Sequence, residues 1–288
     1  MAGKYEKKRK REEKMGKYKL IALDMDGTLL NSKKEISPVT LEMLHRAEAE
    51  EKEIVLSTGR GVAELKEYEE KLKVVRYLNG TSGAVVYDWK EKKVVAENPL
   101  DPKELEIILD AAKKEDAMVH LFTVEEALIQ QSHLDCLEEY QMGIYRKMYE
   151  TVAKKVENIY TYYAEHPFPV TKCNLYHRCV ESRARTEQYL RERGIASAMV
   201  HSEITALEFN AAGVNKGTGL LQLCEHLHVS PEEVIAVGDA NNDLEVLQIA
   251  GLSVAMGNGI EEVKALADVV VADCDHDGCA EAIEKYLL

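Results

Sequence analysis

Several features that would restrict the function are missing from this sequence of 288 residues. Its six cysteines form no Cys-x-x-Cys pair, which argues against a structural zinc site. No apolar run approaches the roughly 20 residues that a membrane-spanning helix needs. No secretory signal is recognisable, so we expect free thiols in a reducing compartment and a cytoplasmic protein.

Basic residues are also fewer than acidic ones. The chain carries 37 Lys and Arg against 51 Asp and Glu, a formal net charge of −14. An acidic surface repels phosphate backbones and anionic lipids, so we expect neither nucleic acid nor a membrane as a partner. Residues 1–17 are the exception, with eight Lys and Arg against three Glu. This pattern predicts a basic, poorly ordered leader.

The chain does contain short, nearly continuous apolar runs, which are typical of strands buried on both faces of a parallel sheet. These runs are residues 18–24, 53–58, 233–239, 252–258 and 268–273. Helical patterns alternate with them at 37–51, 215–228 and 242–251, and Ser37 before Pro38 is a typical start of a helix. The alternation predicts an α/β domain with a doubly wound, Rossmann-like parallel sheet.

The middle of the chain has a different pattern. Residues 85–208 begin with a predicted hairpin and continue with helices at about 102–115, 134–142 and 180–193, between runs that resemble strands. We therefore expect an α+β domain at 85–208, inserted into a discontinuous α/β domain of residues 18–84 and 209–288.

Polar side chains follow three of the predicted strands, at the point where each strand ends. Asp24 and Asp26 follow the first strand, Thr58 and Gly59 the second, and Asp239 a later one. Ligands of open parallel sheets bind outside the carboxyl ends of the strands. These side chains should therefore converge on one site.

The acidic residues of this site suggest a cation. Like charges placed this close repel one another unless positive charge lies between them. The set contains only oxygen donors, without His or Cys, which suits Mg²⁺ better than Zn²⁺. The predicted metal ligands are Asp24, Asp26, Asp239 and Asp243.

The neighbouring residues suggest an anion that meets the metal. Thr58 and Gly59 precede a predicted helix, whose N-terminus favours phosphate. Lys216 at the start of another helix adds positive charge, and Asn242 can donate hydrogen bonds. One aspartate could attack phosphorus while another transfers protons.

The motifs "DMDGTLL" (24–30), "LSTGR" (56–60), "VNKGTGL" (214–220) and "GDANND" (238–243) occur in this order. With the later "AMGN" and "ADVVV" they resemble the haloacid dehalogenase superfamily, most closely its Cof-type phosphatases, whose α/β cap is inserted late in the chain. The resemblance covers residues 18–288 and implies that the inserted α+β domain is this cap.

The resemblance also implies a role for each site residue. Asp24 would be the nucleophile and a Mg²⁺ ligand, and Asp26 the general acid and base, with its backbone carbonyl on the metal. Thr58 and Lys216 would hold the phosphoryl group, and Asn242 would lie near it. Asp239, supported by Asp243, would complete the metal site.

The expected function is a Mg²⁺-dependent phosphatase that acts on a small phosphorylated metabolite, with sugar phosphates the implied class, through an aspartyl-phosphate. A phosphohexomutase-like phosphotransferase and a non-catalytic protein that binds phosphometabolites are the alternatives. The chain departs from the family at Ser82, which precedes Gly83-Ala84 where the family usually has Asn, and near Cys274, where it often has Asn.

Two further patterns are better explained by packing. Cys224 and His228 lie four residues apart on a predicted helix, but no other metal ligand is near them in the sequence. The tyrosines between 140 and 163 could form a sugar-binding platform, yet aromatic side chains mainly supply buried area. We therefore expect Cys224 and His228 to lie on a packed or surface face of their helix, and the tyrosines to pack within the inserted domain.

Overall fold

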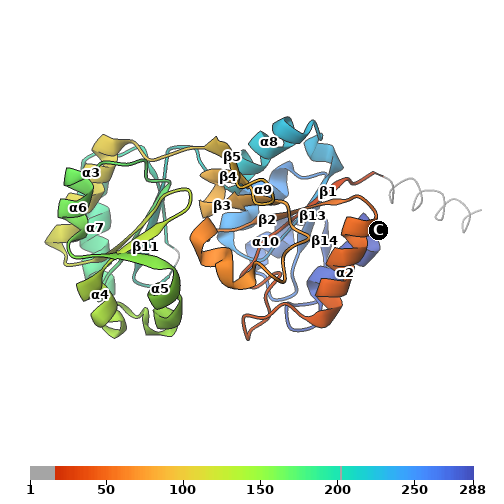
Figure 1. Cartoon of the computed structure of the whole chain (residues 1–288), viewed down its shortest axis with the longest axis horizontal. Coiled ribbons are helices and arrows are strands. Elements are labelled where there is room, and N and C mark those ends of the chain that lie inside the picture. Colours follow the sequence, from red (N-terminus) through yellow and green to blue (C-terminus); the bar gives the residue numbers. More distant parts are fainter. Residues whose placement is uncertain (1–16, 202) are drawn as a thin grey trace, which may run out of the picture. The chain divides into compact units, whose positions relative to one another are not determined.

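The computed structural model describes residues 17–201 and 203–288, which form two compact units (Figure 1). The first unit comprises the chain up to Gly59, Tyr68–Ala96 and Asn215–Leu288. The second comprises Arg60–Glu67 and Glu97–Val214. Apart from Lys17, the predicted basic leader lies outside the described residues.

The boundaries of the two units differ from those expected at 84/85 and 208/209. Residues 85–96 belong to the first unit because their first strand pairs antiparallel with Tyr77–Gly80 and so extends the sheet of that unit. The short segment Arg60–Glu67 belongs to the second unit, where Ala63 packs against Phe122 and Ala127.

A large twisted sheet organises the first unit. Its described strands run in the order β14, β13, β12, β1, β2, β3, β4, β5. Their bounds are Val269–Val270, Leu252–Ala255, Val234–Gly238, Leu20–Leu23, Glu53–Ser57, Tyr77–Gly80, Val85–Asp88 and Lys93–Glu97. Neighbouring strands from β14 to β3 are parallel, and β4 is antiparallel to β3.

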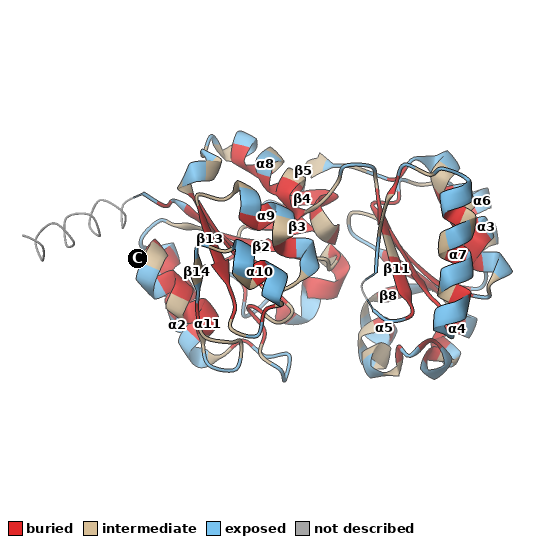
Figure 2. Ribbon diagram, turned by 180° about the vertical axis from the view of Figure 1, so that it is seen from behind, coloured by how far each residue is buried: buried red, intermediate tan, exposed pale blue. Residues whose placement is uncertain are grey.

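Helices cover both faces of this sheet, so its central strands are buried throughout (Figure 2). On one face, α8 (Lys216–Leu227), α9 (Leu244–Ile249) and α10 (Glu261–Leu266) contribute to the apolar cluster around Leu20 and Ala236. The helix α2 (Pro38–Ala49) packs on β2, and the helical turn η7 (Ile283–Leu287), which follows α11 (Gly278–Ala282), packs on β1. The doubly wound architecture predicted from the sequence is confirmed.

The predicted start of α2 is confirmed at the level of atoms. The Ser37 hydroxyl accepts a hydrogen bond of 3.1 Å from the backbone N–H of Thr40, and Pro38 occupies the first turn. This bond satisfies one of the N–H groups that a helix leaves without a partner at its N-terminus.

The second unit has a sheet of its own. Its described strands run in the order β10, β11, β9, β6, β7, β8. Their bounds are Ala198–Val200, Ala206–Asn210, Lys172–Tyr176, Met118–Phe122, Ala127–Gln130 and Ala153–Val156. Neighbouring strands from β10 to β7 are antiparallel, and β8 is parallel to β7.

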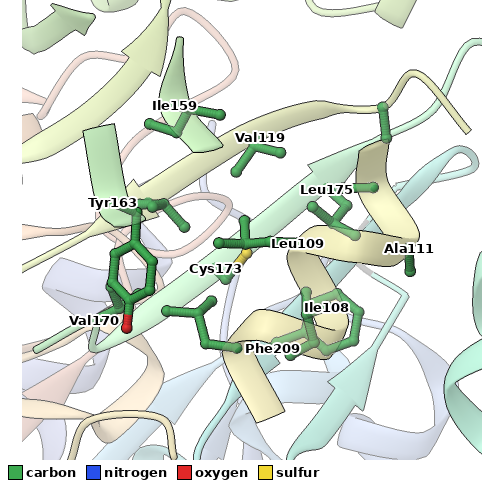
Figure 3. Packing of buried hydrophobic residues seen from close by; sticks show 14 of the residues in the cluster. Ile108, Leu109, Ala111, Val119, Ile159, Tyr163, Val170, Cys173, Leu175 and Phe209 are labelled. Carbon is green, nitrogen blue, oxygen red and sulfur yellow. The ribbon is translucent and has the colours of Figure 1, made fainter. Parts of the chain in front are cut away.

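One face of this second sheet is apolar and is covered by two long helices and a shorter one. These are α3 (Pro102–Lys114), α6 (Ile159–Glu165) and α7 (Val180–Glu192). Figure 3 shows Leu109 of α3 and Ile159 of α6 among Val119, Cys173 and Phe209 of the sheet. The burial of this face supplies a separate hydrophobic core, as an independent α+β domain requires.

The other face is covered by short helices and turns. They are α4 (Gln131–Asp135), the 3₁₀ turns η3 (Leu137–Tyr140) and η4 (Gly143–Tyr145), α5 (Arg146–Val152) and the 3₁₀ helix η1 (Val62–Tyr68). The helix expected at 134–142 is instead broken at Cys136, whose backbone leaves the helical region at φ −123°. Tyr140 and Tyr149 are buried in the cluster beneath these elements, which confirms that they pack within the domain.

No helix in residues 17–201 and 203–288 combines the length and apolar character needed to cross a bilayer.

Candidate active site

Three carboxylates meet where strands of the first sheet end. Asp24 directly follows β1, Asp239 directly follows β12, and Asp243 ends the 3₁₀ turn η6 (Asn241–Asp243). One oxygen of each lies within 4.8 Å of one oxygen of each of the others. Among the residues that the structure describes, this is the one group of three or more acidic, His or Cys side chains arranged so closely.

Lys216 places a positive charge among these carboxylates. Its Nζ lies 2.5 Å from Asp24 Oδ1 and 2.6 Å from Asp243 Oδ1, and the side chain is completely buried. It is the first residue of α8, which Asn215 caps by accepting a hydrogen bond from the Thr218 N–H. The start of α8 therefore delivers the ammonium to the centre of the site.

Backbone and side-chain hydrogen bonds fix the orientation of the carboxylates. Asp243 Oδ2 accepts bonds from the N–H groups of Asp239 and Ala240, at 2.9 and 3.0 Å. Thr28 Oγ1 donates to Asp239 Oδ1 at 3.0 Å. Gly27 has φ +87°, and a Cβ there would lie 2.4 Å from Asp239 Oδ2, so only glycine fits.

The electrostatics of the site favour a cation. Burial raises the pKa of the Asp24 carboxyl well above its usual value, and Asp243 and Asp239 add to the shift while Lys216 opposes it. Burial and the neighbouring Asp243 raise the pKa of Asp239 to about 6. Burial works against the charge of Lys216, yet the two carboxylates beside it raise its pKa. More positive charge would favour the ionised forms of Asp24 and Asp239.

Mg²⁺ fits this donor set. The converging groups are carboxylate oxygens, which Mg²⁺ prefers, and no imidazole or thiolate is part of the group. Asp24, Asp239 and Asp243 are therefore the side chains in a position to hold it.

Asp26 stands apart from this acidic group. Its carboxylate is 38% exposed and lies 2.8 Å from the Nζ of Lys34. The side chain is thus available for proton transfer, while the metal contact expected for this residue involves its backbone carbonyl. The pairing with Lys34, which lies eight residues further along the chain, was not predicted from the sequence.

The predicted phosphate ligands differ in their surroundings. Thr58 is buried and directly follows β2; its N–H donates to Asn79 O at 2.9 Å and its carbonyl accepts from Ser82 N at 3.0 Å. Gly59 beside it is half-buried. Asn242 is exposed on η6, next to Asp243.

Asn79 is a site-supporting residue for which the sequence indicated no role. It is fully buried, and its Nδ2 donates to Ser57 Oγ at 3.0 Å and to the carbonyl of Lys216 at 2.7 Å. Together with the bond from Thr58 N, these contacts join the end of β2 to the start of α8. A Cβ at Gly219 would lie 2.0 Å from Asn79 Oδ1, so this helix can approach only with glycine there.

Asn258 is a second residue whose role the sequence did not predict. Its Nδ2 donates to the Gly27 carbonyl at 2.8 Å and lies 3.4 Å from Asp239 Oδ2. Its Oδ1 accepts from the Cys274 N–H at 2.9 Å. The motif "AMGN" contains this asparagine, but only the folded chain shows that it links three loops around the site.

Other clusters of metal-ligating residues do not gather in the same way. Cys224 is buried in the apolar cluster of the first unit, and His228 is exposed at the end of α8, so the first packs and the second lies on the surface. In the acidic loop at 273–278, Asp275 accepts from Ser32 N and Asp277 from Ser37 Oγ. These two carboxylates hold loops together.

The chain is similar to known proteins over nearly its whole length. The family model of haloacid dehalogenase-like hydrolases matches residues 21–283. Phosphatase YwpJ of Bacillus subtilis (strain 168) is 27% identical over 290 residues, which covers 94% of this chain and 100% of the relative. The 5-amino-6-(5-phospho-D-ribitylamino)uracil phosphatase YcsE of the same organism is 28% identical over 271 residues, covering 94% and 96%.

A solved structure has the same fold. It is a haloacid dehalogenase-like hydrolase from Bacteroides thetaiotaomicron, 31% identical, with a TM-score of 0.82 and coverage of 93% of this chain and 99% of that chain. Together these matches confirm the predicted Rossmann-like core with an inserted cap, and they identify the chain as an enzyme of the phosphatase type. The chain belongs to the haloacid dehalogenase-like hydrolases.

Proposed function

We propose that this chain is a Mg²⁺-dependent phosphatase that hydrolyses a small phosphorylated metabolite through an aspartyl-phosphate on Asp24. The observation that carries the proposal is the contact of Lys216 with both Asp24 and Asp243 at the carboxyl end of β1. One oxygen of each of these carboxylates lies within 4.8 Å of one oxygen of Asp239. A nucleophile, a positive charge for the phosphoryl oxygens and a set of metal ligands are thus combined in one place.

The residues divide the reaction into two steps. In the first, an Asp24 oxygen attacks phosphorus while the ester oxygen leaves with a proton from Asp26. In the second, Asp26 takes a proton from water, whose oxygen attacks phosphorus and releases phosphate and the Asp24 carboxylate. Splitting the hydrolysis in this way returns both aspartates to their starting states.

The other site residues hold the phosphoryl group. Lys216 supplies positive charge, and the hydroxyl of Thr58, with Gly59 and Asn242 beside the site, supplies hydrogen-bond donors. Mg²⁺, held by Asp24, Asp239, Asp243 and the carbonyl of Asp26, would neutralise charge on the phosphoryl oxygens. The Lys216 ammonium also reduces the repulsion that an incoming phosphate meets from the carboxylates.

The second unit is proposed to act as the cap that selects the leaving group. It has its own sheet and core, and so can present a surface independent of the catalytic loops. One relative is named for a substrate whose phosphate sits on a ribityl chain, which bears several hydroxyl groups. A phosphorylated sugar or sugar alcohol is the substrate class that we propose for this chain.

A screen of phosphorylated metabolites with Mg²⁺ tests this proposal, with kcat/KM reported for each compound. We expect hydrolysis of one or a few esters, and no hydrolysis by Asp24→Asn. Transfer of phosphate from a hexose bisphosphate to a sugar instead of water would indicate a mutase. Binding of phosphate esters without turnover of any of them would indicate a non-catalytic protein.

A further inference from the structure

A tight turn at residues 31–35 follows the first motif and carries Lys34. The Asn31 side-chain oxygen accepts hydrogen bonds of 3.0 Å from the backbone N–H groups of Lys33 and Glu35. The backbone of Asn31 closes the turn, because its N–H donates to the Glu35 carbonyl and its carbonyl accepts from the Lys34 N–H, both at 2.9 Å. An asparagine that bonds to the backbone two residues further on is typical of a turn. The shape of this turn is therefore encoded within five residues.

Lys34 has a backbone conformation that few residues with a side chain adopt. Its φ is +60°, in the left-handed region that glycine, asparagine and aspartate enter most readily. Glycine or asparagine would fit the turn with less strain, so the turn itself does not require a lysine. Strained residues of this kind gather at functional sites, where the surrounding structure holds them in place. The reason for a lysine at this position therefore lies in its side chain.

Contacts from distant parts of the first unit hold the turn in place. The Tyr68 hydroxyl donates to the Lys34 carbonyl at 3.2 Å, and the Ser32 N–H donates to Asp275 Oδ1 at 2.9 Å. All four residues belong to the first unit. The backbone of Lys34 thus has a fixed place relative to the end of β1.

The fixed backbone directs the Lys34 ammonium to Asp26. Its Nζ lies 2.8 Å from Asp26 Oδ1, the distance of a charge-assisted hydrogen bond. The buried Leu30, which lies between them in the chain, forms a β-bridge with Asp26 and so links the turn to the strand end. The lysine side chain is 52% exposed and the aspartate side chain 38%, and ion pairs this exposed contribute little to stability. Stability alone does not account for the pair.

The neighbouring lysine provides a contrast. Lys33 lies in the same turn and is also exposed, but within residues 17–201 and 203–288 its ammonium forms no salt bridge. Of these two adjacent lysines, Lys34 is the one that contacts a residue of the site. The geometry of the turn, and not a general excess of positive charge, therefore selects the partner of Asp26.

We propose that Lys34 is a positioning residue for Asp26. Its ammonium holds Oδ1 of the carboxyl group, so that the other oxygen carries the proton to the leaving group and back. The inference rests on the proposed phosphatase function and adds to it a residue from outside the four motifs.

Holding Asp26 matters because a proton donor must lie about 2.6–3.2 Å from the oxygen that it protonates. In the first step, the Asp26 proton passes to the ester oxygen while the bond from that oxygen to phosphorus breaks and the bond from Asp24 to phosphorus forms. In the second step, Asp26 takes a proton from the attacking water. Lys34 keeps its own proton throughout, and Oδ1 can accept its hydrogen bond in both states of the carboxyl group.

Two aryl esters of similar shape test the proposal in the full-length protein with Mg²⁺. Phenyl phosphate depends more on a proton donor than p-nitrophenyl phosphate does, because phenolate is the more basic leaving group. Lys34→Met should lower the single-turnover rate of phenyl phosphate by about tenfold relative to p-nitrophenyl phosphate, which is part of the usual contribution of a general acid. KM and the melting temperature should change little. Lys34→Arg, which keeps a charged donor, should recover most of the rate.

Two further variants separate positioning from other roles. Lys33→Met, the matched control in the same turn, should leave both rates unchanged. In Asp26→Asn the carboxyl group that Lys34 holds is gone, so adding Lys34→Met should cause no further loss. On the best substrate of the metabolite screen, Lys34→Met should lower kcat and leave KM nearly unchanged.

Other outcomes overturn the inference. Equal losses on the two esters, or a further loss when Lys34→Met is added to Asp26→Asn, would show that Lys34 acts elsewhere. A raised KM with an unchanged kcat would make it a substrate contact. If Lys34→Met matches the unmodified protein on every substrate, the inference fails while the phosphatase function stands. If the unmodified protein hydrolyses neither ester and no screened metabolite, the proposed function fails and this inference fails with it.

Discussion

At the scale of single residues, the two aspartates of the first motif have different environments. Asp24 is buried in contact with Lys216, whereas Asp26 is partly exposed and paired with Lys34. The buried carboxylate can be held in line with phosphorus, and the exposed one can exchange protons with solvent. This difference is consistent with the separate roles that we propose for the two carboxylates.

Substitution of either aspartate by asparagine should therefore impair hydrolysis in a different way. Asp24→Asn should abolish hydrolysis of every ester, because no aspartyl-phosphate can form. Asp26→Asn should slow hydrolysis of sugar phosphates by about 10²–10⁴-fold, the usual contribution of a general acid. It should slow the first step with p-nitrophenyl phosphate much less, because nitrophenolate leaves without a proton. Single-turnover kinetics would measure this step, and equal losses on both substrates would contradict the assignment.

Asn79 offers a second prediction at this scale. Asn79→Leu keeps the approximate shape but removes the hydrogen bonds to Ser57 and to the Lys216 carbonyl. We expect a loss of about 1–3 kcal/mol in the free energy of unfolding, since a buried carbonyl loses its partner. We also expect weaker inhibition by inorganic phosphate, because the start of α8, which carries Lys216, loses its side-chain link to the end of β2.

The control for Asn79 is Ser57→Ala, which leaves the bond to the Lys216 carbonyl in place. Urea denaturation and phosphate inhibition should both show a smaller effect for this variant. If Ser57→Ala is as damaging as Asn79→Leu, the contact with α8 is not the important one.

At the scale of elements, the start of α8 connects stability with function. Asn215 and Thr218 form reciprocal hydrogen bonds, N–H of Thr218 to Asn215 Oδ1 at 2.9 Å and N–H of Asn215 to Thr218 Oγ1 at 3.0 Å. This capping box fixes the first turn of the helix, and Lys216 lies in that turn. The position of the ammonium thus depends on a local structure that the sequence encodes within four residues.

Changing this cap should affect both stability and catalysis. Asn215→Ala should cost about 1 kcal/mol of unfolding free energy and should also lower kcat/KM. Ser37→Ala removes the cap of α2, which carries no site residue, so it should cost a similar amount of stability and leave kcat/KM nearly unchanged. Denaturation curves and initial rates measured on both variants test this expectation. An equal loss of kcat/KM in Asn215→Ala and Ser37→Ala would refute it.

At the scale of the whole molecule, folding gathers buried acidic groups that need positive charge. The pKa of Asp239 rises from 3.8 to about 6, so the folded, metal-free protein holds this proton more tightly than the unfolded chain does. The contribution of Asp239 to the stability of the metal-free protein is therefore lost as the pH rises from 3.8 to about 6. Above this pH range, bound Mg²⁺ should restore the stability.

Mg²⁺ should therefore raise the melting temperature relative to EDTA at about pH 7.5, and raise it less at about pH 5.5, where protons compete for Asp239. A ligand at 100 times its Kd adds about 2.7 kcal/mol. Asp239→Asn should remove most of the rise in melting temperature that Mg²⁺ causes. Asp275→Asn, which lies outside the acidic group, should leave this rise unchanged. Equal melting points with Mg²⁺ and EDTA would exclude the metal site.

The sequence by itself determined the class of the fold and the acidic centre of the site. Continuous apolar runs specify strands buried on both faces, and the order of runs and helices specifies a doubly wound sheet. Because parallel strands end at one edge, Asp24, Asp239 and Asp243 could be expected together before their distances were known. A cytoplasmic location remains a prediction.

Tertiary structure alone decided the contacts that join distant segments. Asn79 and Lys216 are 137 residues apart in the chain, and no local pattern encodes their hydrogen bond. The same holds for the hydrogen bonds between Asn258 and Gly27 and between Tyr68 and Lys34. Periodicity reports which face of an element is buried, but the partners across that face are fixed only when the elements pack.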